Sequence, residues 1–210
     1  MAAHWLGALH LSARQTRGAE ILPERGPAYY LELMHKARGN ILQNLANPVM
    51  MPIDIELLRR ILTQMDVLES NWEKLLKSCE GIPQTLIHGD FRPKNIHVKQ
   101  TPAGDVLYAM DWETAGWGIP LVDLAPSRGL SPGAQVNVPI YLSIVQEFWQ
   151  NLDLPTLQYF VHVGRIFRRL AAMYWSSLGL SYRWLEEPIQ SMQIFHKELA
   201  QAMTDVFGRS

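Results

Sequence analysis

Apolar and polar positions alternate with the period of an α-helix over most of the chain. Apolar residues recur every three or four positions, which predicts helices that bury one face. Pro155 suits the first turn of a helix, and a helix break at Pro188 is left open. The predicted helices cover residues 3–14, 29–45, 53–78, 140–152, 155–178 and 184–206. Clusters of glycine and proline predict exposed loops over residues 17–27 and 128–139.

The middle of the chain has a different pattern. Short apolar runs at residues 86–87, 96–98 and 106–110 are typical of strands, and the last is predicted to be buried. Residues 101–105 have turn composition, so the second and third runs predict a β-hairpin. The fold class is therefore mainly α with a small β-hairpin unit (α+β). We expect one domain over residues 1–210, with helices in 1–80 and 126–210 around a hairpin segment at 84–125.

Composition excludes several classes of protein. Hydrophobic residues make up 48% and charged residues 19% of the chain, as in globular proteins, and the net charge of −1 argues against nucleic-acid binding. No stretch is apolar for the length of a membrane helix. The single cysteine, Cys79, fits a reducing compartment, so a cytoplasmic location is expected, and we interpret it as an inert thiol.

Candidate chemistry lies in the loop between the first two apolar runs. Gly89 and Pro93 exclude a helix there, and the loop carries Asp90 and Asn95. The predicted hairpin returns the chain so that Asp111 comes to lie beside them. Two carboxylates and an amide oxygen are hard ligands that suit Mg²⁺ carried by nucleotide phosphates.

These residues match a known family pattern. His88-Gly89-Asp90, four further residues, Asn95 and then Asp111-Trp112-Glu113 resemble the catalytic segment of the aminoglycoside phosphotransferase / choline kinase family. Residues 118–125 are similar to the family's G-D-P-x-x-D-L-A segment, with Ile119 in place of the usual Asp, and residues 6–10 resemble its first large-lobe helix. The resemblance implies a protein-kinase-like fold.

The resemblance also implies roles for single residues. Asp90 would accept the proton of an acceptor hydroxyl, and Asn95 and Asp111 would hold Mg²⁺. Arg92 would meet the transferring phosphoryl group, with a surface salt bridge as the equal alternative. Glu113 would approach a second Mg²⁺ or remain a solvated loop carboxylate, and Lys94 is expected to be solvated. His88 and Asp123 are expected to support the loop.

The implied function is an ATP-dependent phosphotransferase that acts on a hydroxyl of a small molecule. Two alternatives stay open: a non-catalytic binding or regulatory module, and, less favoured, metal-dependent hydrolysis at Asp90 and Asp111. Glu186 and Glu187 would suit a cationic acceptor or simply begin a helix. A set of aromatic residues would line the acceptor pocket or pack in the core: Trp149, Tyr159, Phe160, Phe167, Tyr174, Trp175, Tyr182 and Trp184.

A kinase of this family also needs a small N-terminal β lobe with a phosphate-covering loop and a strand lysine. No G-x-G-x-x-G occurs, and no strand-like run precedes the first predicted helix. We therefore expect a large C-terminal lobe that lacks the N-terminal β lobe. A truncated gene product, an engineered fragment and a subunit completed by another chain stay open as explanations, and self-association or capture of a partner is expected. Such a lobe would leave apolar surface uncovered around Trp5, Leu6 and Leu9 and around the hairpin.

Overall fold

The computed structural model describes residues 1–125 and 136–208. Contacts divide the chain into two compact units. Unit 1 consists of Met1–Gly26 and Gly81–Arg165, and unit 2 of Pro27–Glu80 and Ile166–Ser210. The mainly helical content with two small sheets confirms the α+β class, whereas a single domain over residues 1–210 stays a prediction. None of the described helices is long and apolar enough to cross a membrane.

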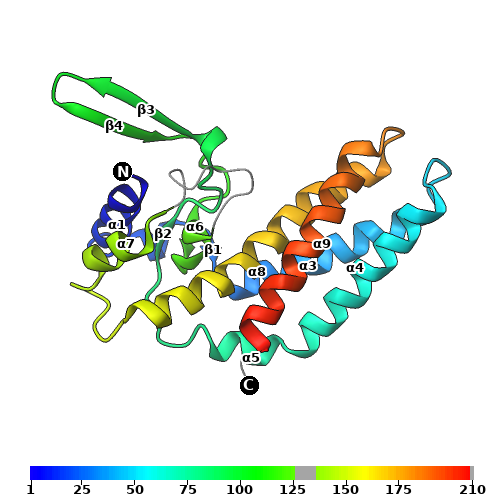
Figure 1. Cartoon of the computed structure of the whole chain (residues 1–210), viewed down its shortest axis with the longest axis horizontal. Helices are drawn as coiled ribbons and strands as arrows, with labels where there is room; N and C mark the ends of the chain where they lie inside the picture. Colours follow the sequence, from blue (N-terminus) through cyan, green and yellow to red (C-terminus); the bar gives the residue numbers. More distant parts are fainter. Residues whose placement is uncertain (126–135, 209–210) are drawn as a thin grey trace. The chain divides into compact units, whose positions relative to one another are not determined.

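Unit 2 is helical. Its α4 packs against α3 and α9, and its core includes the fully buried Leu58, Met65 and Phe167 (Figure 1). The predicted helix 53–78 breaks at Asn71, and Pro188 causes no break because it lies in the first turn of α9. The elements are α3 (Pro27–Asn44), α4 (Pro52–Ser70), α5 (Trp72–Lys77), the second part of α8 (Leu154–Leu178), η3 (Gly179–Ser181) and α9 (Glu186–Phe207).

Unit 1 contains the second group of helices. The first helix, α1, lies along α7, and Gly7 allows a close approach because a Cβ there would meet Ile144 at 2.8 Å (Figure 1). Helix α7 is shorter than the predicted 140–152, and most of the predicted loop 128–139 lies outside the described residues. The helices are α1 (Ala2–Ala13), α2 (Gly18–Ile21), α6 (Leu121–Leu124), α7 (Val138–Val145) and the first part of α8.

Unit 1 also contains a three-stranded sheet, whose strands come before and after residues 88–95 in the sequence. Its central strand β5 (Gly116–Gly118) runs parallel to β1 (Glu24–Arg25) and antiparallel to β2 (Thr85–Ile87). The prediction of a plain loop over residues 17–27 was wrong, because that stretch contains α2 and β1. Strands of two or three residues are too short for any periodicity, and only their pairing across the chain defines them.

The hairpin prediction is confirmed. Strand β3 (Ile96–Thr101) pairs antiparallel with β4 (Gly104–Ala109), with Val98 opposite Leu107, and the short η1 helix (Pro93–Asn95) leads into it. The prediction that the last run is buried was wrong, since only Leu107 of β4 is buried. A two-stranded sheet that shares no ladder with the other sheet leaves most of its side chains in solvent, and Figure 1 shows it as an arm.

Candidate active site

The backbone of the loop at residues 88–95, called here the 88–95 loop, is held by one buried carboxylate. Asp123 of α6 is 1% exposed, and its oxygens accept hydrogen bonds from the amides of His88 (2.7 Å) and Gly89 (2.8 Å). Burial opposes the charge, but hydrogen bonds from His10 and the loop outweigh it and lower the pKa of Asp123. The carboxylate therefore stays ionised and fixes the entrance of the loop.

The chain turns sharply at Gly89, and only glycine fits there. Its φ is +78°, in the left-handed region, and a Cβ at this position would lie 2.6 Å from the carbonyl oxygen of Thr114. The Thr114 hydroxyl donates to the His88 carbonyl (3.0 Å). Thr114 was missed by the sequence reasoning, because a threonine in a turn carries no motif.

The His88 side chain connects the loop to the end of the hairpin. Its ring is fully buried, and its Nε2 lies 2.9 Å from the carbonyl oxygen of Met110. Its Nδ1 accepts from the backbone amide of Asp90 at 3.3 Å, so Nε2 carries the hydrogen. This arrangement holds Met110, the residue before Asp111, against His88, which lies two positions before Asp90.

The Asp90 carboxylate is surrounded by donors. Arg92 Nε lies 2.8 Å from both of its oxygens, and the Asn95 amide nitrogen donates to Oδ2 at 2.9 Å and to the Asp90 carbonyl at 3.0 Å. Lys94 Nζ is more distant, at 3.9 Å. Asp90 remains partly accessible, with 22% of its side chain exposed. Arg92 thus forms a salt bridge with Asp90, and its role toward a phosphoryl group stays a prediction.

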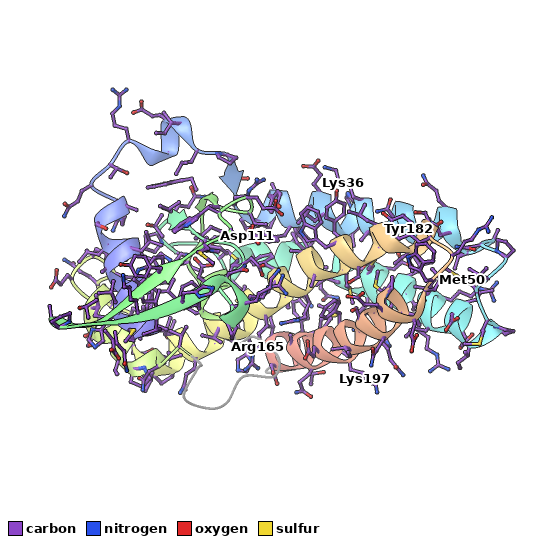
Figure 2. The ribbon with its side chains drawn as sticks, turned by 90° about the horizontal axis from the view of Figure 1, so that it is seen from above. Lys36, Met50, Asp111, Arg165, Tyr182 and Lys197 are labelled. Atoms are coloured by element: carbon purple, nitrogen blue, oxygen red, sulfur yellow. The ribbon has the colours of Figure 1, made fainter. Side chains whose placement is uncertain are left out.

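Asn95 and Asp111 lie on two connected backbone segments. The Met110 amide donates to the Asn95 carbonyl at 2.9 Å, and Asp111 follows with a left-handed φ of 63° that Asp tolerates. Because the Asn95 nitrogen faces Asp90, its Oδ1 is the atom left for a ligand. Asp111 and Glu113 are both exposed, and Figure 2 labels Asp111 near the base of the hairpin. Within residues 1–125 and 136–208, no three His, Cys, Asp or Glu side chains gather as a metal cluster.

An aromatic cluster packs α1 against the 88–95 loop. Trp5 stacks on Phe91 with ring centroids 5.4 Å apart, and Trp112 contacts both Trp5 (6.0 Å) and His88 (4.6 Å). The expectation of uncovered apolar surface was wrong for Leu6, which is fully buried. The sequence placed Trp5 within the first predicted helix but gave no sign of its partner.

The predicted acceptor residues are divided between the two units. Trp149, Tyr159 and Phe160 belong to unit 1, where Trp149 stacks on Phe160, and the other five belong to unit 2. Phe167 is core, whereas Trp184 is 77% exposed just before α9. Glu186 and Glu187 are exposed in the first turn of that helix. The acceptor roles of these residues stay predictions.

Comparison with known proteins adds four findings. A profile of the phosphotransferase enzyme family (APH) matches residues 2–133. The structure of a choline kinase from Cryptosporidium parvum Iowa II is similar, with a TM-score of 0.63 and 12% identity over 99% of this chain and 65% of that one. LicA, solved in complex with AMP, has a TM-score of 0.54 and 20% identity over 95% of this chain and 61% of that one. No curated protein matches.

The two structural neighbours share the kinase-like fold, and the chain spans less than two thirds of the length of each. The family profile covers more than half of the chain, including the 88–95 loop, the hairpin, Asp111 and Asp123. The chain belongs to the phosphotransferase enzyme family.

Proposed function

We propose that this chain supplies the catalytic and Mg²⁺-binding lobe of an ATP-dependent phosphotransferase that acts on a hydroxyl group of a small molecule. One observation carries the proposal: the nitrogen and the oxygen of the Asn95 side-chain amide face different directions. Its nitrogen donates to Asp90, which fixes the carboxylate. Its Oδ1 is thereby directed away from Asp90, as a metal ligand requires.

Asp90 acts as the base in this mechanism. The acceptor hydroxyl approaches the exposed part of the carboxylate and passes its proton to Asp90 as its oxygen bonds to the γ-phosphorus. The bond from the γ-phosphorus to the β–γ bridging oxygen breaks, and ADP leaves with that electron pair. Asn95 and Arg92 keep the Asp90 carboxylate in place for this step. The guanidinium of Arg92 has further N–H donors that suit a phosphoryl oxygen.

The donor set fits Mg²⁺. Asn95 Oδ1 and the exposed Asp111 carboxylate offer hard oxygen atoms, and nucleotide phosphates would supply further oxygen ligands. We propose that Asn95 and Asp111 hold the metal and that Glu113 reaches a second ion. When bound, Mg²⁺ would neutralise charge that develops on the phosphate oxygens.

The rest of the nucleotide site comes, in our proposal, from outside the described residues. A separate β lobe that carries a phosphate-covering loop and a lysine is not found among them, and this chain matches 65% and 61% of the two neighbours. A β-rich lobe, either a further segment of the protein or a partner chain, would add these groups. Hairpin residues such as Val98 and Tyr108 are about half exposed and offer apolar surface to it. Self-association through the same surface is the alternative.

The test is transfer of labelled γ-phosphate to a panel of cationic and neutral hydroxyl compounds. It is run on the purified chain alone and with any β-rich lobe encoded next to it. We expect Mg²⁺-dependent transfer that falls by about 10²–10⁴-fold in Asp90→Asn, because an amide cannot accept the proton. Asp105→Asn, an exposed carboxylate in β4, is the matched control and should keep full activity. Equal turnover in Asp90→Asn and the parent would exclude the catalytic assignment, and no transfer in either assembly would favour a binding module.

A further inference from the structure

A chain of buried polar side chains runs from α7 through α1 to the 88–95 loop. Tyr141 OH lies 2.8 Å from His10 Nδ1, and His10 Nε2 lies 3.5 Å from Asp123 Oδ2. The rings of Tyr141 and His10 meet edge to face at 5.7 Å. Tyr141 and His10 are fully buried, as is Asp123 to within 1%. Three helices thus contribute one residue each to a path that ends at the amides of His88 and Gly89.

We propose that His10 and Tyr141 are positioning residues of the active site, which orient Asp123 and through it the backbone that presents Asp90. A buried histidine is often only a packed side chain, but here both ring nitrogens face polar groups that are buried as deeply. Because these groups are buried, each of these bonds is costly to lose. The proposal rests on the proposed function only for its effect on turnover.

The direction of the hydrogen bonds follows from chemistry. Burial and the nearby Asp123 charge raise the pKa of Tyr141 well above its ordinary value, so the phenol keeps its proton and donates to His10 Nδ1. His10 then carries hydrogen on Nε2 and donates it to Asp123. Tyr141 therefore fixes the tautomer of His10 and holds its ring toward the carboxylate.

The main chain at His10 is tied as well. The Thr85 hydroxyl, fully buried in β2, donates to the His10 carbonyl oxygen at 2.8 Å. Strand β2 leads directly into His88, so helix α1 contacts both sides of the loop entrance: its backbone through Thr85 and its side chain through Asp123. A shift of α1 would move both contacts together.

Amide hydrogen exchange of the 88–95 loop tests this without any need for activity. Asparagine at position 10 places its amide near the former Nδ1 and loses Asp123, whereas glutamine reaches the position of Nε2 and keeps a donor there. We expect exchange at His88 and Gly89 to be about tenfold faster in His10→Asn, and about threefold faster in His10→Gln and in Tyr141→Phe, which keep the donor to Asp123.

Val145→Ala is the matched control. Val145 is a fully buried α7 residue with an apolar side chain, so its truncation loosens packing but leaves the polar path intact. Its loop exchange should stay within about twofold of the parent. Unchanged exchange at His88 and Gly89 in His10→Asn, or equal acceleration in all four variants, overturns the proposal. If His10→Asn does not fold, Tyr141→Phe, which keeps the ring, decides by the same criterion.

Kinetics link the path to catalysis. In an active assembly, kcat should fall in the same order as the loop exchange rises, with His10→Gln retaining more turnover than His10→Asn and with the acceptor KM unchanged. If kcat does not fall in the order in which the exchange rates rise, the catalytic part of the proposal is overturned. If no variant and no parent transfers phosphate, the proposed function fails while the exchange result still stands on its own.

Discussion

Two neighbouring segments of unit 1 are stabilised in opposite ways. In the 88–95 loop, polar side chains from other elements hold the backbone, with Asp123 and Thr114 bonded to the first turn. In the β3–β4 hairpin, the strand ladder pairs the two backbones, and side chains add single hydrogen bonds only to the Gly104 and Ala109 carbonyls at the two ends of β4. Apolar side chains such as Val98 (52% exposed) and Tyr108 (49% exposed) face solvent. Polar groups are buried in the first segment and apolar groups are exposed in the second.

The two segments differ because the loop needs a fixed geometry and the hairpin needs a partner surface. A loop that presents a base must keep its geometry before the substrate arrives, and buried charged hydrogen bonds supply that order. An isolated two-stranded hairpin is marginally stable in water, and uncovered apolar side chains are typical of a surface that meets another protein segment. The contrast predicts large effects for substitutions under the loop and small ones on the hairpin.

The largest effect on stability is expected for Asp123→Asn. One oxygen that accepts a backbone amide would become a donor, and His10 would lose its charged partner. Losing a hydrogen bond to a buried charged group costs about 1.5–3 kcal/mol of unfolding free energy. Chemical denaturation measures it, and a loss below about 1 kcal/mol would show that the loop does not depend on this carboxylate.

Acid should remove the same contribution. The pKa of Asp123 is lowered in the fold, so its stabilisation is present above the ordinary Asp pKa of about 3.9 and is lost as the pH falls through the lowered value. The gap in unfolding free energy between the parent and Asp123→Asn should therefore narrow below about pH 4. Melting curves from pH 6 down to pH 2 measure the gap, and a constant gap would contradict the linkage.

Substitutions of Arg92 and Lys94 distinguish the contributions of the two cations near Asp90. Arg92 Nε lies 2.8 Å from both carboxylate oxygens, whereas Lys94 lies at 3.9 Å and is 57% exposed. In an active assembly we expect turnover to fall about tenfold in Arg92→Ala and to stay within about twofold in Lys94→Ala. Equal losses in the two variants would mean that net positive charge, and not the close ion pair, matters.

The smallest effect is expected on the hairpin. Val98→Thr and Val106→Thr exchange an exposed methyl for a hydroxyl and keep the β-branched shape. The unfolding free energy of the purified chain should change by less than about 0.5 kcal/mol. A loss of more than about 1.5 kcal/mol would reveal that the hairpin is covered, most simply by a second copy, which sedimentation would detect.

The sequence predicted the elements whose apolar residues recur with a regular period. Helix α3 and helix α8 follow clear apolar periods, and both were placed to within two residues. Strands β1 and β5 were not predicted, because two or three residues have no period and pair only through tertiary contacts. Asn71 breaks a predicted helix without glycine or proline, so no local signal marked the change.

The site shows the same limit. The spacing of His88, Asp90, Asn95 and Asp111 was visible because these residues are close in sequence or joined by one hairpin. His10 and Tyr141 lie 131 positions apart and met only in the folded chain. Burial of Val106 was also predicted wrongly, because an apolar run does not say what covers it. The motif residues could therefore be predicted from the sequence, and the buried contacts that hold them in place could not.

Binding of Mn²⁺ in place of Mg²⁺, followed by electron paramagnetic resonance with ATP present, tests the central claim most directly. If this chain supplies the metal ligands, it will bind the Mn²⁺–nucleotide complex, with millimolar rather than micromolar affinity where the second wall of the site is missing. Binding should be lost in Asp111→Asn and kept in Asp105→Asn. Binding that is equal in the parent and both variants, or absent in the parent with and without an added β-rich lobe, would contradict the account.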